Sequence, residues 1–442
     1  MILTRQQKLF RGNGSAPNAR AIADGVITAL SPAAWYRNAT DVVSSGGFAS
    51  IWADYASSDK GLVLPGVIGN YASAPDSTAV SVTGDIDIQI RLSAADWTPA
   101  VIVPLVSKRI NAGQYGYDFY VASTGALIFR YSPDGTASRT ATSSAVNTLT
   151  DGDISWLRAT YNSTTGKVNF YTGGSGASPS WAALGAEQTL TAGAIFDGTD
   201  RLDIGTDAGV YANGTVYRAI IKSGIDGTTV FDADFSSQAI GAGSFTESSS
   251  NAATVTINTS GAAPAHIGKA RDLLQGTGTN QPAYSAGVFT FDGVDNYLKT
   301  APFTLNQPET IYLVVNQVSW TAGDSLIDGN TGNSMRVYQN SSTPGIALYA
   351  GATTNQNTDL TVGAFKILTA VYNGASSLLI VNAGTASTGN PGVNNGGGFT
   401  LGGTVASYSD IQIKEAVVFA AAHDASTRSS VITALNNALT VF

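Results

Sequence analysis

The chain has 442 residues, a formal net charge of −8, 12% charged residues and 43% hydrophobic residues. This length predicts two or three domains, each large enough to bury a core. The Lys and Arg residues form no dense cluster, so the sequence predicts no nucleic-acid partner. No apolar run approaches the roughly 18 residues of a membrane span, and cysteine is absent, which excludes disulfides and thiolate metal sites.

Glycine is abundant, with 49 residues, whereas charged residues are about half as common as in an average domain. This composition suits a large β-protein with tight turns. It also suits a surface packed against neighbouring molecules, where charged side chains are costly to desolvate. The first residues lack the apolar centre of a secretion signal. We therefore expect synthesis in a cytoplasm, and release by lysis or by a dedicated route.

The chain begins with an arm, residues 1–27, which is polar and basic at first and then suits a short helix over residues 18–30. The arm precedes the first strand and carries few large apolar groups. We therefore expect it to add little to either domain core.

The first predicted domain covers residues 28–262 and contains many short strands separated by turn sequences. Its clearest strand covers residues 85–92, where apolar and polar side chains alternate with the period of two of a half-buried strand. We interpret Asp85 and Asp87, on the polar side, as the solvent face of a strand near the sheet edge.

A short connection rich in small residues leads to the second predicted domain, residues 263–442. Its hairpin over residues 288–298 turns at Asp292-Gly293. A C-terminal helix is predicted to begin at Asp424 or Ser426, which can cap it. We expect this helix to pack on the sandwich edge through one apolar stripe, formed by Val431, Ile432, Leu435 and Leu439.

The two predicted domains repeat the same order of strand sequences. The corresponding runs are 84–90 and 309–315, then 159–162 and 370–373, then 201–206 and 399–404. A repeat of such long period indicates two domains of one architecture, with shorter loops in the second copy, rather than a solenoid.

Several of these segments resemble a known family. Residues 289–298 and 310–315 resemble the opening of concanavalin A-like (laminin-G-like) domains, and residues 399–403 and 413–419 resemble their back half. Ala34-Trp35-Tyr36 and the segment from Trp52 resemble the entry of such modules in virion structural proteins of tailed phages. The resemblance implies an all-β fold: two tandem jelly-roll sandwiches with a short N-terminal arm and a C-terminal helix. It implies no single function, because this fold includes lectins, hydrolases and adhesion modules.

The carboxylates give little support to catalysis. Glycoside hydrolysis needs two carboxyl groups flanking the scissile bond, and none of the four glutamates has a carboxylate two residues away: Glu187, Glu247, Glu309 and Glu415. Asp85 and Asp87 share a strand face, but we interpret them as a polar surface. No nucleophile elbow accompanies the two histidines, so we expect a protein that is not an enzyme.

Aspartates in predicted loops offer a calcium alternative, since Ca²⁺ prefers oxygen ligands. The candidates are Asp197 and Asp200 in the first domain, and Asp292 and Asp295 in the second. Aspartate also caps turns through its own backbone, and we prefer that interpretation. We therefore expect no required cofactor, with calcium as the open alternative.

Aromatic residues beside Gly-rich or Ser-rich loops are the candidates for contact with a glycan or a partner. They are Tyr115, Trp181 and Tyr211, since exposed aromatic rings stack on sugars whereas buried rings belong to the core. By alternation, Tyr117 and Phe119 are predicted to lie in the core.

Together these patterns predict a non-enzymatic bacteriophage virion protein that decorates the particle surface. We expect the arm to bind other virion proteins and the protein to form a homo-oligomer, with neither nucleic acid nor membrane as partner. The alternative is a tail or baseplate adhesin that binds a host-surface glycan. A further alternative is a secreted module that binds or cleaves polysaccharide.

Overall fold

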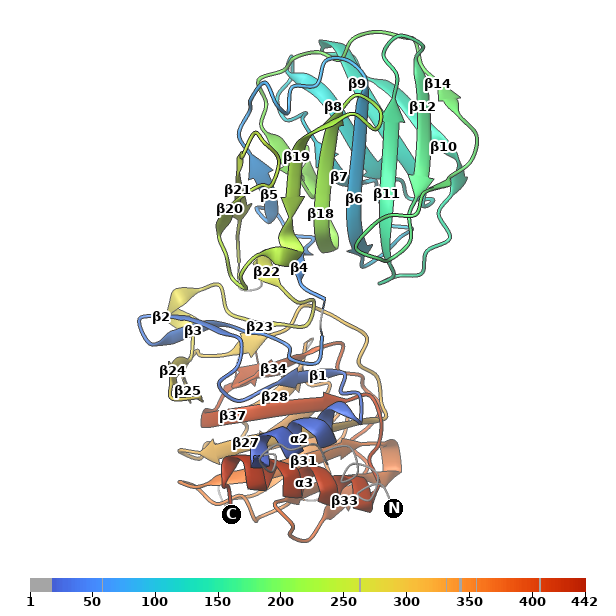
Figure 1. Ribbon diagram of the computed structural model, residues 1–442. Coiled ribbons are helices and arrows are strands. Elements are labelled where there is room, and N and C mark those ends of the chain that lie inside the picture. The colour runs from blue at the N-terminus through green and yellow to red at the C-terminus, as the bar shows by residue number, and fades with distance from the viewer. Residues whose placement is uncertain are drawn as a thin grey trace, which may run out of the picture. The chain divides into compact units, whose positions relative to one another are not determined.

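The structure is a computed structural model that describes residues 18–442 except 58, 262–263, 331, 342–343, 355 and 405–406. The chain forms two compact units (Figure 1). The first sandwich comprises residues 41–281 and 298–301, and the second sandwich comprises residues 18–40, 282–297 and 302–442 of the described chain. No helix in these described ranges is long and apolar enough to cross a membrane.

The first sandwich is built from two large antiparallel sheets. In spatial order, the nine-stranded sheet contains β13 (Ala182–Ala183), β12 (Lys167–Thr172), β11 (Ile154–Tyr161), β6 (Ile86–Ala94), β18 (Asn213–Ser223), β4 (Gly61–Pro65) and β22 (His266–Gly268), with β14 (Gln188–Thr189) also beside β12 and β19 (Thr228–Asp234) also beside β18.

The eight-stranded sheet contains, in spatial order, β10 (Arg139–Val146), β9 (Ala126–Gly135), β8 (Tyr115–Val121), β7 (Val103–Ser107), β15 (Leu202–Ile204), β5 (Tyr71–Ala74), β21 (Thr254–Asn258) and β20 (Ser244–Thr246). Two smaller antiparallel sets complete the unit: the hairpin β16 (Thr206–Asp207) and β17 (Val210–Tyr211), and the strands β2 (Val42–Ser45), β3 (Phe48–Trp52), β23 (Leu273–Leu274) and β26 (Leu298–Lys299).

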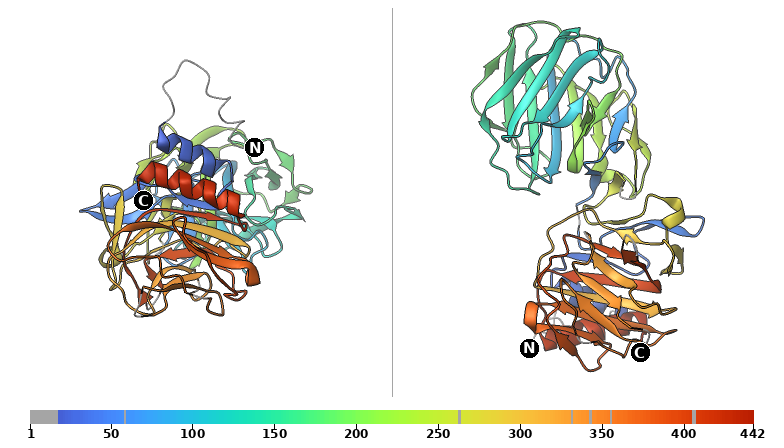
Figure 2. Two further views of the ribbon diagram at one scale, coloured as in Figure 1. Left: turned by 90° about the horizontal axis from the view of Figure 1, so that it is seen from below. Right: turned by 180° about the vertical axis from the view of Figure 1, so that it is seen from behind.

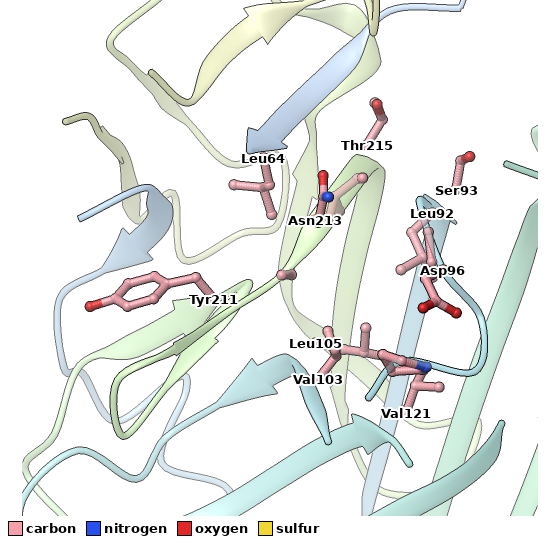
Figure 3. A pocket seen from close by; sticks show the side chains of 15 residues that line it. Leu64, Leu92, Ser93, Asp96, Val103, Leu105, Val121, Tyr211, Asn213 and Thr215 are labelled. Carbon is pink, nitrogen blue, oxygen red and sulfur yellow. The ribbon is translucent and has the colours of Figure 1, made fainter. Parts of the chain in front are cut away.

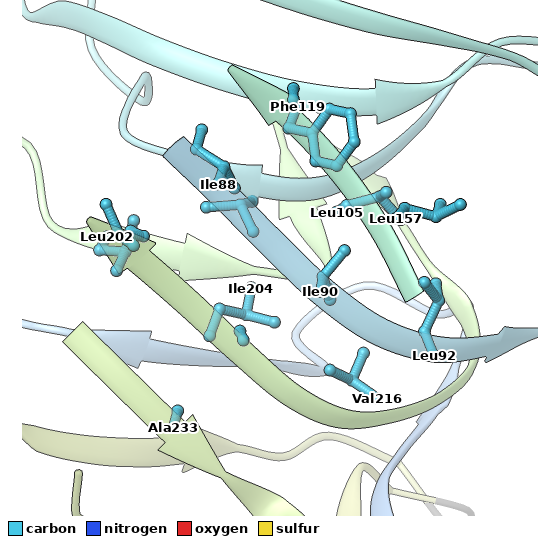
Figure 4. Close-up of a cluster of buried hydrophobic side chains, with 14 of the residues drawn as sticks. Ile88, Ile90, Leu92, Leu105, Phe119, Leu157, Leu202, Ile204, Val216 and Ala233 are labelled. Carbon is cyan, nitrogen blue, oxygen red and sulfur yellow. The ribbon is translucent and has the colours of Figure 1, made fainter. Parts of the chain in front are cut away.

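The core of the first sandwich lies between its two large sheets (Figure 4). Ile88 and Ile90 of β6 meet Phe119 of β8 and Leu105 of β7 in one fully buried cluster. Tyr117 and Phe119 are buried, as their alternation predicted. The period of two thus correctly identified the inward faces of β6 and β8.

The second sandwich repeats this strand order. One sheet contains β33 (Ser387–Gly389), β32 (Ser377–Val381), β31 (Phe365–Tyr372), β27 (Glu309–Gln317) and β37 (Asp410–Phe419), followed by β25 (Val288–Asp292) with β24 (Ala283–Ser285), and by β1 (Ala34–Tyr36). The other contains β30 (Ile346–Tyr349), β29 (Arg336–Gln339), β28 (Ser325–Gly329), β34 (Phe399–Leu401), β35 (Gly403–Thr404) and β36 (Ser407–Tyr408).

The predicted duplication is therefore visible in the sheets. The order β12-β11-β6-β18 of the first sandwich corresponds to β32-β31-β27-β37 of the second. Corresponding glycines follow β15 and β34: Gly205 and Gly402 have φ angles of +85° and +83°, and a Cβ there would lie 2.4 and 2.1 Å from core side chains. The predicted all-β class, with two jelly-roll sandwiches, a helix in the N-terminal segment and a C-terminal helix, is confirmed.

Two helices cover the outer face of the β27–β37 sheet (Figures 1 and 2). They are α2 (Ala19–Thr28) and α3 (Ala425–Leu439), which lie side by side. Asp424 caps α3, as predicted. The prediction that α3 covers a sheet edge is wrong, because Tyr312, Val314 and Val417 make the outer face of the sheet apolar and the helix buries that face.

The arm also differs from its prediction. Residues 1–17 lie outside the described residues, but residues 18–27 belong to the second sandwich, where Ala23 and Ile27 are fully buried. The strand β1 pairs with β37 at the opposite end of the sequence. The domain boundaries therefore differ from the predicted divisions 1–27, 28–262 and 263–442.

A buried carboxylate holds this N-terminal segment in place. Glu415 of β37 accepts hydrogen bonds from the guanidinium of Arg20 at 2.6 and 2.9 Å and from the indole nitrogen of Trp35 at 2.8 Å. The backbone N–H of Asn38 donates to the same side chain at 3.3 Å. A charge that is paired and hydrogen-bonded in this way can be buried at acceptable cost.

Candidate functional site

Three aromatic side chains form a platform on the outer face of the nine-stranded sheet: Trp156 of β11, Tyr171 of β12, and Trp181, which precedes β13. The ring of Trp181 lies edge-on to Trp156, with centroids 6.2 Å apart, and 6.4 Å from the Tyr171 ring. Trp156 is buried, whereas Tyr171 and Trp181 are partly exposed. This aromatic platform includes the predicted contact residue Trp181.

The guanidinium of Arg158 packs against two rings of the platform. Its guanidinium carbon lies 5.1 Å from the Tyr171 ring centre and 5.5 Å from that of Trp181. The same guanidinium donates to both oxygens of Asp87, at 2.9 and 2.7 Å, and to Asp226 at 2.6 Å. Because these carboxylates neutralise it, Arg158 serves to fix the two rings and is not available to a ligand.

The loop that carries Trp181 is tied to the sheet. The indole nitrogen of Trp156 donates to the carbonyl of Gly176 at 2.9 Å, and Arg91 donates to the carbonyl of Ser175 at 2.7 and 3.1 Å. At Gly173, a Cβ would lie 2.8 Å from the Trp181 ring. A glycine at this position therefore lets the Trp181 ring pack closely against the strand.

Polar side chains lie beside the platform on the same strand. Asn169 alternates with Tyr171 on the outer face of β12 and donates to Glu187 at 3.3 Å. Lys167 pairs with Glu187 at 2.8 Å, and each of these two side chains is 44% exposed. Partly exposed aromatic rings next to amide, carboxylate and ammonium groups can bind a ring that has an apolar face and hydroxyl edges.

The other two predicted aromatic contacts lie elsewhere in the first sandwich. Tyr115 begins β8 in the other large sheet, and the guanidinium of Arg109 covers its ring at 4.1 Å. Tyr211 lies on β17 and is among the residues lining a pocket (Figure 3). The three predicted aromatics therefore do not form one site.

The pocket beside Tyr211 opens between the two large sheets and is mainly apolar. Its open space is about 520 Å³, including the mouth. Side chains of Leu64, Leu92 and Val103 line it, while the ring of Tyr211 points away from them in Figure 3. This arrangement offers apolar surface but no stacking ring, so it suits a sugar less well than the platform does.

Three of the four aspartates predicted as calcium ligands accept hydrogen bonds within the fold, and the fourth, Asp197, is exposed in a loop. Asp200 accepts from the backbone N–H groups of Ile110 and Asn111 at 2.5 and 2.7 Å, and Asp292 accepts from that of Val294 at 2.9 Å.

Asp295 accepts from the Asn296 side chain at 3.3 Å, and Asp197 is exposed in the loop before β15. Among the described residues there is no group of three or more His, Asp or Glu side chains placed to hold a metal ion.

The two carboxylates of β6 bind partners within the fold. Asp85 accepts from Asn162 at 2.9 Å and from the backbone of Ser163 at 2.7 Å, and the fully buried Asp87 binds Arg158. The interpretation of Asp87 as a solvent-facing residue near a sheet edge is wrong. β6 pairs on both sides, with β11 and β18, and the arginine covers the carboxylate.

Sequence reasoning missed Tyr171 and Arg158. The signal for Tyr171 was the alternation along β12, where Asn169 and Tyr171 occupy the face opposite to Val168 and Phe170. Arg158 could not be found in this way, because its importance depends on partners that are distant in sequence.

No protein-family model matches the chain, and a search of curated proteins gives no significant match. Domains LG4-5 of the mouse laminin α1 chain are similar with a TM-score of 0.32 and 11% identity, over 87% of this chain and 94% of that chain. The LG1-3 region of the laminin α2 chain gives a TM-score of 0.38 and 8% identity, over 82% of this chain and 62% of that chain.

A structure described as a putative carbohydrate-binding protein from Bacteroides ovatus gives a TM-score of 0.33 and 10% identity, over 47% of this chain and 61% of that chain. At these TM-scores the similarities carry no argument about function. None of these three structures is described as a phage protein, so the expected place on a phage particle gains no support from them.

Proposed function

We propose that the protein is a non-enzymatic glycan-binding protein of the adhesin type, and that the aromatic platform is its binding surface. The observation that carries the proposal is the partly exposed ring of Trp181, fixed beside Tyr171 and next to hydrogen-bonding side chains. A flat aromatic face packs against the C–H face of a sugar, while amide and carboxylate groups bind its hydroxyls.

The fixed position of the platform favours binding, because a ligand then does not have to order the loop. Arg158 and the two loop hydrogen bonds hold Trp181 before any ligand arrives. Preorganisation of this kind lowers the entropic cost of association.

The test is retention of the full chain on a glycan array, followed by titration with the retained sugars. Trp181→Ala should weaken binding about fivefold or more, the effect of roughly 1 kcal/mol of stacking, and Tyr171→Ala should also weaken it. The matched control is Trp320→Ala, which removes a partly exposed tryptophan from the second sandwich and should leave binding unchanged.

Two results would reject the proposal: no glycan retained above background, or equal affinities of wild type and Trp181→Ala. Loss of binding in Tyr115→Ala or Tyr211→Ala alone would move the site to one of the other predicted aromatics.

The absence of hydrolysis is part of the proposal. It is supported by the internal roles of Asp85 and Asp87, each of which binds donors within the fold. Incubation with the retained glycans should release no reducing ends, and steady release by the wild-type protein would contradict a purely binding role.

Decoration of a phage particle is the second candidate. The observation in its favour is the low share of charged residues, 12%, which suits a surface buried against neighbouring subunits. Mass spectrometry of purified particles tests it directly. Residues 18–27, part of the arm expected to bind other virion proteins, pack against the outer face of a sheet of the second sandwich.

A further inference from the structure

Five side chains form a charged cluster on the outer face of the eight-stranded sheet: Arg109, Asp118, Tyr120, Arg130 and Asp207. Asp118 on β8 lies directly opposite Arg130 on β9, and such paired residues share one face of a sheet. Asp207 comes from the hairpin β16–β17, and the hydroxyl of Tyr120 reaches its carboxylate. The cluster is independent of the aromatic platform, which lies on the other large sheet.

The charges of the cluster converge on two carboxylate oxygens. The Oδ2 atom of Asp118 lies 3.7 Å from Arg109 and 3.1 Å from Arg130, and the Oδ2 atom of Asp207 lies 3.6 Å from each arginine. The two guanidinium groups are therefore close neighbours. Each arginine side chain is 20% exposed, whereas Asp118 is 1% exposed.

The hydroxyl of Tyr120 links the two carboxylates of this cluster. The hydroxyl of Tyr120 lies 2.5 Å from the Oδ2 atoms of both Asp118 and Asp207. A hydroxyl has one hydrogen to donate, so Tyr120 can donate to only one of the two carboxylates while both are ionised. Burial raises the pKa of Asp118 to about 6, so this carboxyl takes up a proton as the pH falls through about 6. With Asp118 neutral, two arginines face one carboxylate and the cluster is positive.

The arginines of the cluster also have unused donors. The buried Nε atoms of Arg109 and Arg130 have no hydrogen-bond partner. Arg201, on the same face of the same sheet, differs: its guanidinium donates to Asp203 at 2.7 and 3.1 Å and to the hydroxyl of Tyr71 at 3.0 Å. Buried donors without partners are costly, and an anion that draws the guanidinium groups toward it would offset that cost.

We propose that Arg109 and Arg130 bind an oxyanion, a carboxylate or sulfate group, at the rim of this cluster. Guanidinium groups bind planar or tetrahedral oxyanions through paired N–H donors. The anion can be a free ion or the acidic group of a saccharide, since the recognising chemistry is the same. Protonation of Asp118 strengthens the site, because it removes a negative charge that competes for the same two guanidinium groups.

The experiment is a titration of the full chain at constant ionic strength, followed through the Arg side-chain Nε–H signals in NMR spectra. The probes are inorganic sulfate, a sulfated disaccharide and its unsulfated parent, with chloride as the ionic-strength control. Sulfate should shift the Arg109 and Arg130 signals saturably. A tighter response to the sulfated disaccharide identifies a saccharide as the source, and an equal response identifies the free ion.

Variants separate a binding site from a structural ion cluster. Arg109→Gln and Arg130→Gln should weaken sulfate binding about tenfold, whereas the control Arg201→Gln should leave it within about twofold. Asp118→Asn should tighten binding at pH 7.5 by about fivefold and remove its dependence on pH between 5 and 7.5. A gain of affinity cannot result from misfolding.

The proposal is overturned if chloride reproduces the shifts, if the response does not saturate, or if Arg201→Gln weakens binding as much as Arg109→Gln. It is also overturned if Asp118→Asn leaves the affinity at pH 7.5 unchanged.

Discussion

Two buried glutamates of the second sandwich differ in their hydrogen bonding. Glu415 accepts bonds from Arg20, Trp35 and Asn38, whereas both carboxylate oxygens of Glu309 are buried without a partner. Burial raises the pKa of Glu309 to about 8, so this side chain is neutral in the folded protein at pH 7 and charged in the unfolded chain.

Glu309→Gln should therefore stabilise the protein at neutral pH. Because the pKa of Glu309 is higher in the folded protein, its contribution to the free energy of unfolding is fully present below the pKa of the unfolded chain, about 4.5. This contribution is lost as the pH rises toward 8. At pH 7 the protein has lost about 3 kcal/mol of stability in this way. A glutamine at this position does not ionise and so causes no such loss. Denaturant unfolding at pH 4 and pH 7 measures the effect. An unchanged pH dependence in the variant would contradict the assignment.

Glu415→Gln is the matched comparison and should act in the opposite direction. The substitution removes the buried charge that pairs with Arg20 and leaves the guanidinium with Asp24 as its counter-ion. We expect a loss on the order of 1–3 kcal/mol in the unfolding of the second sandwich. Denaturant unfolding measured in parallel with Glu309→Gln checks this expectation, and an unchanged free energy of unfolding would mean that the ion pair adds nothing to the stability of the second sandwich.

At the scale of elements, α2 and β1 complete the second sandwich. β37 pairs with β25 along its first half and with β1 along its second half. In the first sandwich β18 is flanked in the same way by β4 and β19. The difference is that β19 follows β18 directly in the chain, whereas α3 follows β37 and the vacant edge is filled by residues 34–36.

Deletion of residues 18–40 should destabilise the second sandwich and spare the first. The deletion exposes the apolar outer face around Tyr312 and Val417, and it frees an edge of β37. Hydrogen exchange should accelerate in β27 and β37 and stay slow in β6 and β11. Unchanged protection of β37 would show that β1 and α2 are dispensable.

The sequence predicted well which side chains of a strand point into the core. It predicted poorly whether the outward side chains are exposed or buried. Alternation placed Ile88 and Ile90 in the core, because side-chain direction in a strand depends only on local geometry. The same pattern could not reveal that Asp87 is buried, because that depends on Arg158, 71 residues away. Pairing of β1 with β37 was unpredictable for the same reason, since nothing near residue 35 specifies a partner beyond residue 400.

The candidate sites also depend on residues that are distant in sequence, which a local pattern cannot reveal. Trp181 was predicted from its loop, but Tyr171 and the charged cluster were not, since their environment is assembled by strand pairing. The outer faces of β27 and β37 could have been recognised, because continuous apolar runs such as residues 311–315 indicate strands buried on both sides.

At the scale of the whole chain, the first sandwich is an insertion in the second. Residues 41–281 lie between β1 and β24, both of which belong to the second sandwich. A fragment of residues 41–301 should therefore fold alone, because it contains both large sheets and their core.

A fragment of residues 282–442 should be insoluble or partly unfolded, and fusion of residues 18–40 to its N-terminus should restore it. Circular dichroism and thermal unfolding of the three fragments test this expectation. Cooperative unfolding of residues 282–442 without the fusion would contradict it.

The pairing of β1 with β37 has a consequence for synthesis on the ribosome. Residues 34–36 leave the exit tunnel before the inserted sandwich is made, whereas their partner, residues 416–418, is translated only after it. The inserted sandwich can fold while the strand and helix ahead of it are still without a sheet to join. The segment that becomes α2 and β1 thus stays without its sheet until β37 has been made, and a chaperone that binds exposed apolar segments would act on the chain in that interval.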